Sequence, residues 1–301
     1  MPFRPPTARE IVAALGSQSK FSPKFRSLVD ILMSRSPPIS RPGPDDWLAQ
    51  IKETPQTVAD YVLHRKFAPS PERSIIYILP LAPFAPPFPP VATLREYLEA
   101  FYFPNRVAVL PAVPLEGLGL TTRIFEGRLQ IHAGSVVARV APTLPPDGFC
   151  LCAITQEDLY PRDSWSFVFG HTEPSKRCGV FSFARYNPGF PGTPSGSLLR
   201  RSCKVLAHET GHLFGLKHCL HYRCAMNGSN SLEESEGRPV FLCPVCLGKM
   251  YRCVPFDPLL RYRVLGAFFD AHRTDFPEEL EEVRHRLEMI NAPPRGDPKR
   301  R

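Results

Sequence analysis

The sequence predicts an α/β fold in the broad sense that includes α+β, and three observations support it. Arg106–Leu110 and Phe149–Thr155 are short apolar runs typical of buried strands. Between them, Leu129–Val140 has a residue pattern that favours a helix, so strands and helices alternate along the chain. A longer helix is expected over Ser197–Lys217, where leucines and a valine can anchor one face.

The chain of 301 residues is long enough to bury a substantial core, and we divide it into three parts. An N-terminal region over 1–90 ends in the Pro-rich stretch Pro80–Pro90. That stretch could be a polyproline II ligand, but a stiff linker is the simpler interpretation. The main domain is predicted over 91–290, and a basic, disordered tail over 291–301.

Other elements follow from local signals. Short helical patterns occur at Ala8–Leu15 and Asp45–Lys52, separated by prolines. Thr93 and Glu96 form a capping box, which predicts that a helix starts there. A C-terminal helix is expected over Phe276–Ile290, where Glu-Arg pairs indicate a solvated face.

Composition argues against several classes of protein. The formal charge is +8, but part of the excess lies in Arg295–Arg301, and no basic run is interleaved with aromatic residues, so we expect no nucleic-acid partner. The most apolar stretch, Ser74–Leu94, contains six prolines and cannot supply a membrane helix. Met1–Pro23 lacks the apolar core of a secretory signal. A soluble, intracellular protein is expected, in the cytoplasm, with the nucleus left open.

One motif carries most of the chemistry. His208 and His212 stand four residues apart and can share one face of a helix, while Glu209 is offset beside them. Gly215 can take a positive φ and turn the chain back, which brings His218 round as a third nitrogen ligand. Three histidine ligands leave a fourth position on zinc open for water.

Such a site has the parts needed to hydrolyse a peptide. Zinc lowers the pKa of its bound water from ~16 toward ~7. Glu209 would take the proton of that water as it attacks a carbonyl, and would be a base rather than a ligand. The short His-Glu-x-x-His form also arises by chance on helix surfaces, but the eleven-residue form is the metzincin signature. Met226 stands where that signature places its methionine, although a single Met in a turn is usually core filling.

A second cluster follows the third histidine directly. Cys219, Cys224, Cys243 and Cys246 have the spacing of a closed, tetrahedral structural zinc site. Two disulfides or four buried free thiols are the alternatives, and His221 is a competing ligand. The predicted cofactor is therefore Zn²⁺, two ions per chain, one catalytic and one structural. The other five cysteines fit reduced core thiols.

Together, the histidine motif, Met226 and the four cysteines resemble the archaemetzincin family of metallopeptidases. The resemblance runs from about Phe103 to Ile290 and includes Tyr160–Gly170 and Gly179–Tyr186. It implies a metzincin-like zincin fold with a mixed twisted sheet, an active-site helix, a Met-turn and a four-cysteine zinc module. It also implies zinc on His208, His212 and His218, Glu209 as the catalytic residue, and the structural zinc on the four cysteines. Asn187–Ser197 is shorter than the corresponding insertion in some members.

The resemblance also implies that an edge strand of the sheet binds the substrate backbone. Cys178–Tyr186 alternates well enough to be that strand, although an ordinary interior strand would give the same pattern. The residues expected to contact the peptide are Gly179, Val180, Phe181, Ser182 and Phe183.

The leading hypothesis is a zinc metallopeptidase that cleaves peptides or proteins, with aminopeptidase-like action on short peptides as an implication of the resemblance. One rival is a zinc-stabilised interaction module with little or no activity, but such a module has no chemical need for Glu209. Another is a nucleic-acid-binding zinc ribbon, which is disfavoured because Cys219 adjoins His218.

Overall fold

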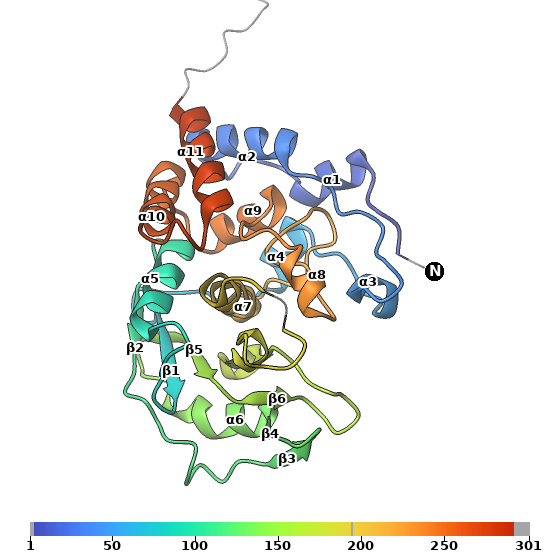
Figure 1. Cartoon of the computed structure of the whole chain (residues 1–301). Coiled ribbons are helices and arrows are strands. Elements are labelled where there is room, and N and C mark those ends of the chain that lie inside the picture. Colours follow the sequence, from blue (N-terminus) through green and yellow to red (C-terminus); the bar gives the residue numbers. More distant parts are fainter. Residues whose placement is uncertain (1–2, 194, 292–301) are drawn as a thin grey trace, which may run out of the picture.

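The centre of the fold is a five-stranded sheet in the order β2-β1-β5-β8-β7 (Figure 1). The computed structural model describes residues 3–193 and 195–291. Four strands are parallel, and β7 is antiparallel to its neighbour β8 at one edge. The strands are β1 (Ile75–Leu81), β2 (Val107–Val109), β5 (Gly148–Thr155), β7 (Gly170–Glu173) and β8 (Cys178–Ser182).

Both faces of this sheet are covered, which explains why its inner strands are apolar throughout. Every residue of β5 is buried. Cys150, Cys152 and Ile154 of β5 face the larger hydrophobic cluster, while Leu151 and Ala153 face the smaller one. The larger cluster contains the helix α7 (Leu198–Leu213), and the smaller one contains α6 (Ala133–Val140).

A smaller sheet lies beside α6, in the lower part of Figure 1. It consists of β3 (Thr122–Phe125), β4 (Arg128–His132) and β6 (Asp158–Tyr160). The remaining helices gather around and above α7 (Figure 1). They are α1 (Ala8–Leu15), α2 (Pro23–Arg35), α3 (Trp47–Gln50), α4 (Val58–His64), α5 (Val91–Phe101), α8 (Leu232–Glu236), α9 (Pro244–Cys253), α10 (Pro258–Ala271) and α11 (Pro277–Asn291).

The N-terminal region belongs to the same packed body as the rest of the chain. Strand β1 lies inside the sheet, between β2 and β5, although it falls within the predicted region 1–90. Pro80, expected in a linker, pairs with Ile154 of β5. Buried side chains of α1, α2 and α4 share the larger hydrophobic cluster. The predicted boundary at residue 90 therefore does not mark a gap in packing. The predicted tail, apart from Asn291 at the end of α11, lies outside the described residues.

Several predicted elements differ in detail from the structure. The helix expected over Leu129–Val140 is the strand β4 followed by α6, because the His132 side chain caps a helix that begins only at Ala133. The helix α5 begins at Val91 without a side-chain cap, so the predicted capping box is wrong. The strand expected over Cys178–Tyr186 ends at Ser182 and lies inside the sheet.

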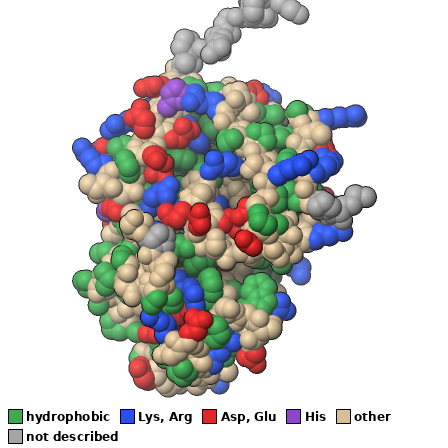
Figure 2. Space-filling model, turned by 45° about the vertical axis from the view of Figure 1, so that its right-hand side comes forward, with side chains coloured by type: hydrophobic (Ala, Val, Ile, Leu, Met, Phe, Trp, Pro, Cys, Tyr) green, Lys and Arg blue, Asp and Glu red, His purple; other side chains and the backbone are tan. Residues whose placement is uncertain are grey.

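Other predicted elements are confirmed. Helices are found at Ala8–Leu15 and Pro277–Asn291, and strands at Val107–Val109 and Gly148–Thr155. Among the described residues, no helix combines the length and the apolar character needed to span a bilayer. The face drawn in Figure 2 carries both signs of charge, with acidic side chains gathered across its middle and basic ones around them.

Candidate active site

The helix α7 positions two of the three predicted histidines. Ser197 caps its first turn by accepting a hydrogen bond from the Arg200 amide, and the helix ends at Leu213. The chain then turns at Gly215, whose φ of 86° is the left-handed conformation expected for it. The amide of Leu216 closes the turn on the Gly211 carbonyl. This reversal returns His218 to the side of the helix that carries His208 and His212.

The three imidazoles converge on one point. A ring nitrogen from each of them lies within 4.8 Å of those of the other two. His208 Nδ1 lies 2.8 Å from the Ala225 carbonyl oxygen, and His212 Nδ1 lies 2.7 Å from that of Leu216. His218 Nδ1 lies 2.6 Å from Glu53 Oε1. An oxygen within hydrogen-bond distance of each Nδ1 favours the tautomer with its proton on Nδ1, which leaves each Nε2 with a free lone pair. At His208, Arg238 Nη1 also lies 3.1 Å from Nδ1.

The donor set fits zinc. The Nε2 atoms of His208 and His212 are 3.1 Å apart, and two nitrogens bound tetrahedrally to one zinc at ~2.0–2.1 Å would lie about 3.3 Å apart. Burial is the main cause that lowers the pKa of the His208 and His212 rings, and the neighbouring His218 acts in the same direction. The pKa of His212 falls to about 3. The rings are therefore neutral at physiological pH, which is the state that binds a metal.

Glu209 lies beside these rings but is not one of the converging ligand groups. Burial raises the pKa of its carboxyl to about 7, although the positive charge of Arg238 acts in the opposite direction. A carboxyl with a pKa near 7 is suited to accept and release a proton. Gly170 of β7 makes room for it, because a Cβ at that position would lie 2.6 Å from Glu209 Cδ.

Met226 lies directly under α7. A Cβ at Gly211, between the two helical histidines, would lie 2.5 Å from Met226 Sδ, so the thioether contacts the helix backbone. Met226 is fully buried. Its carbonyl oxygen accepts a hydrogen bond of 2.7 Å from the Cys219 amide, which links the Met-turn to the first residue after His218.

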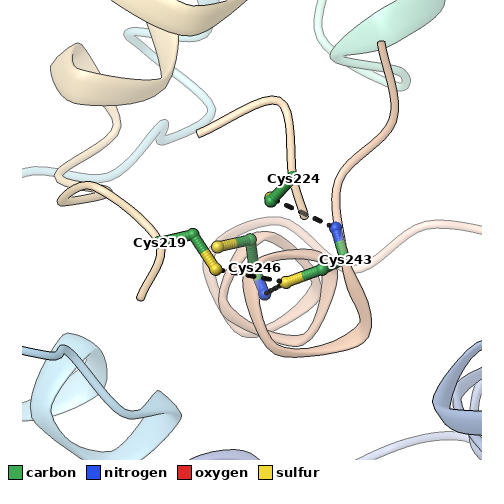
Figure 3. Close-up of side chains that lie close together, drawn as sticks. All are labelled: Cys219, Cys224, Cys243 and Cys246. Carbon is green, nitrogen blue, oxygen red and sulfur yellow. Dashed lines mark hydrogen bonds between the residues drawn. The ribbon is translucent and has the colours of Figure 1, made fainter. Parts of the chain in front are cut away.

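The four cysteines form a second convergent cluster (Figure 3). All four side chains are buried, and their sulfur atoms lie within 4.8 Å of one another. The amide of Cys243 donates to Cys224 Sγ, and that of Cys246 donates to Cys243 Sγ (Figure 3). Amide donors aimed at sulfur favour the thiolate form, which is the form that binds zinc.

A disulfide between Cys219 and Cys243 does not fit the structure. The Sγ atoms of Cys219 and Cys243 are 3.5 Å apart, whereas a disulfide bond measures about 2.05 Å. Burial raises the pKa of the Cys224 and Cys243 thiols, while the thiols around Cys219 donate to it and lower its pKa. Four buried sulfur atoms that converge on one point form a group that could hold a metal ion. His221 is not part of the converging group.

The predicted substrate segment is in the wrong place for its role. β8 pairs with β5 on one side and with β7 on the other, so the backbone of Gly179–Ser182 is occupied by the sheet. Phe183 is also buried, and its amide donates to the Thr155 carbonyl. The strand at the edge beside the metal site is β7 (Gly170–Glu173), which contacts α7. Sequence reasoning missed it because Gly-His-Thr-Glu has no apolar alternation.

Three further residues near the site were not predicted. Glu53 and Trp47, from the N-terminal region, contact His218. Burial acts to raise the pKa of Glu53, but the hydrogen bonds from His218 and Trp47 lower it below the usual value. Arg238 is buried behind His208, with Nη1 donating to the Asn227 carbonyl at 2.6 Å. None of the three belongs to a motif, so the sequence carried no local signal for them.

A cavity of about 560 Å³ opens beside the histidines. One wall consists of His212, His218 and the turn between them, and Thr172 of β7 lines the cavity as well. Residues 53, 54, 56 and 64–67 of the N-terminal region also line it, and its charged lining residues are the acidic Glu53 and the basic Arg65, Lys66 and Lys217. The size suits several residues of a peptide.

We expect Gly170→Ala to reduce cleavage by roughly 10- to 100-fold without unfolding the protein. The new methyl group would displace the Glu209 carboxylate, and displacements near 1 Å in an active site have effects of this size. Steady-state kinetics and thermal melting would measure both quantities. The control is Gly189→Ala, where the nearest atom would lie at 3.5 Å. Equal activity in the two variants would separate Gly170 from the placement of Glu209.

Comparison with known proteins gives the following matches. The model of Peptidase family M54 matches residues 147–252. Archaemetzincin-2 of Homo sapiens is 36% identical over 283 residues, covering 82% of this chain and 78% of that protein. Archaemetzincin-1 of Homo sapiens is 32% identical over 270 residues, covering 78% of this chain and 54% of that protein. The crystal structure of archaemetzincin from Archaeoglobus fulgidus, complexed with malonate, is 29% identical, with a TM-score of 0.44 over 58% of this chain and 99% of that one.

Proposed function

Because this chain belongs to the archaemetzincin family of zinc metallopeptidases, we propose that it hydrolyses peptide bonds at the three-histidine site, with Glu209 as the general base. The observation that carries the proposal is the convergence of three imidazoles beside a carboxyl whose pKa is about 7. A zinc-stabilised module without activity would need neither this carboxyl nor the space that Gly170 leaves for it.

His208, His212 and His218 would hold the catalytic zinc, and the four cysteines would hold a second, structural zinc. When bound, the catalytic zinc polarises the substrate carbonyl and acidifies water. The chain itself supplies the rest. Glu209 takes a proton from the attacking water and delivers it to the leaving amine, which its raised pKa permits in both directions. Thus one carboxyl serves as base and then as acid.

The substrate backbone would pair with β7. This strand is at the edge of the sheet and contacts α7, and Gly170 at its start touches Glu209. A peptide that adds to a sheet edge is held by main-chain hydrogen bonds, which depend little on its sequence. Such pairing would align a carbonyl with the site and leave the side chains to alternate in and out.

Short peptides are the substrates that the cavity favours. Residues 53–67 bound it on the side facing His212 and His218, which limits the length of chain that fits there. Glu53 lines the same space together with Arg65, Lys66 and Lys217, so the lining carries charges of both signs, as do the two termini of a short peptide. Aminopeptidase-like cleavage of short peptides is the form of activity that the family resemblance implies, and we propose it for this chain.

The test is an N-terminally resolved cleavage profile of the purified protein, before and after mild chelation and after zinc is restored. We expect two zinc ions per chain in the loaded protein, and one after chelation. Three histidines leave an exchangeable position on the metal, whereas four buried thiolates enclose their ion. Cleavage should stop when the labile zinc leaves and return with it. Cleavage that persists in the protein with one zinc would contradict the proposal.

A further inference from the structure

The turn that carries His218 is covered by an N-terminal segment, residues 47–56. Glu53 Oε1 lies 2.6 Å from His218 Nδ1 and also accepts a hydrogen bond of 3.0 Å from Trp47 Nε1. The same carboxylate oxygen therefore receives two N–H groups. The indole ring of Trp47 meets the imidazole of His218 edge to face, with 5.1 Å between their centroids.

This segment is itself held firmly in place. The amide of Trp47 donates to both carboxylate oxygens of Glu234, at 3.0 and 3.1 Å. Its indole lies so close to Gly228 that a Cβ there would be 2.5 Å from the ring. Gln56 is buried and bonds the turn twice, donating to the Gly215 carbonyl and accepting from the Lys217 amide, each at 3.1 Å.

His218 differs from the other two histidines in its partner. The Nδ1 atoms of His208 and His212 face backbone carbonyls that come from the same part of the chain. His218 Nδ1 faces a carboxylate 165 positions away in the sequence. A carboxylate fixes the tautomer more strongly than a carbonyl does, and it makes the opposite nitrogen a better electron donor.

We infer that Glu53 is a positioning residue for the catalytic metal site. Its carboxylate holds His218 in the tautomer and orientation that bind zinc. Trp47 holds that carboxylate in place through its indole N–H, and Gln56 holds the turn through its two hydrogen bonds. This assignment rests on the proposed function, since it takes His218 to be a zinc ligand. It gives the N-terminal region a role in the chemistry of the site.

The experiment measures metal affinity rather than activity alone. The full chain, wild type or Glu53→Ala or Glu53→Gln, is titrated with Zn²⁺ against a chelator of known affinity, and with Co²⁺ to record the visible spectrum. Removal of such a partner typically weakens metal binding 10- to 100-fold. We expect a loss of about this size for Glu53→Ala and a smaller one for Glu53→Gln, with an altered spectrum for cobalt on the histidines. The cysteine site should bind as before and serves as the internal reference.

Two further variants sharpen the test. Glu234→Gln weakens the anchor of the same segment without touching His218, and we expect it to leave the affinity of the histidine site near that of wild type. Trp47→Phe removes the N–H that Glu53 accepts, together with the part of the indole that lies against Gly228, and should weaken metal binding a few-fold; its melting temperature is measured beside it. It remains informative if the Glu53 variants fold poorly.

The outcomes distinguish a failure of the proposed function from a failure of the role assigned to Glu53. If wild type binds no metal on its histidines, the proposed function fails. If wild type binds metal there and the Glu53 and Trp47 variants bind it equally well, only the role of Glu53 is lost. A loss in Glu234→Gln as large as that in Glu53→Ala would also overturn the role, because loosening of the segment would then account for the effect.

Discussion

Glu209→Gln should yield a folded, zinc-loaded protein whose kcat/KM is lower by at least ~100-fold. Glutamine keeps the volume and the hydrogen-bonding oxygen of the side chain but cannot accept a proton, and a general base typically contributes ~10² to 10⁴ in rate. Burial raises the pKa of Glu209 to about 7, which suits a group that must both take and return a proton. The measurement is steady-state kinetics together with zinc content and melting temperature.

The matched control for this variant is Glu157→Gln. Burial also raises the pKa of Glu157, with a contribution from the neighbouring Asp158, but this carboxyl lines a different cavity. Its replacement should leave turnover near that of wild type. Near-wild-type turnover in Glu209→Gln would show that the proton is handled elsewhere.

Cys243→Ser should mainly damage stability, with loss of the enclosed metal and a fall of several kcal/mol in the free energy of unfolding. A structural zinc contributes its binding free energy directly to folding. Cys243 also caps α9 by accepting from the Cys246 amide, and its sulfur lies among buried neighbours. Activity should fall in step with the folded fraction. Thermal melting and metal analysis would measure the change.

Cys253→Ser is the control on the same helix. Cys253 belongs to α9 but lies outside the quartet and is only partly buried, so a change of less than ~1 kcal/mol is expected. A Cys243→Ser protein that melts like wild type and yet cleaves nothing would place the cysteines in the chemistry rather than in the scaffold.

The sequence was most informative where a function depends on local geometry. His208 and His212 share a helix face because they are four residues apart, and Gly215 takes the positive φ that its place after the helix requires. The candidate metal ligands could therefore be predicted from spacing and side-chain chemistry. The helices α1, α7 and α11 followed from local patterns in the same way, whereas α2, α4, α8, α9 and α10 were not predicted.

Pairings between residues far apart in the sequence could not be predicted from local patterns. The prolines around β1 argue against an inner strand, yet Pro80 follows five strand residues and needs no amide donor at that position. The edge strand β7 is short and polar, so apolar alternation points to its neighbour β8 instead. Glu53 could not be found at all, because nothing near it in the sequence indicates that His218 lies beside it.

The distance along the chain between Glu53 and His218 has a consequence for how the enzyme is made. Residues are synthesised from the N-terminus, so the segment that covers the third histidine leaves the ribosome long before α7 exists. Strand β1 is likewise synthesised before β5, its parallel partner in the sheet. Non-local pairings of this kind form slowly. The peptidase site can thus be completed only late in synthesis, and the nascent chain has no assembled cleft with which to cut its neighbours.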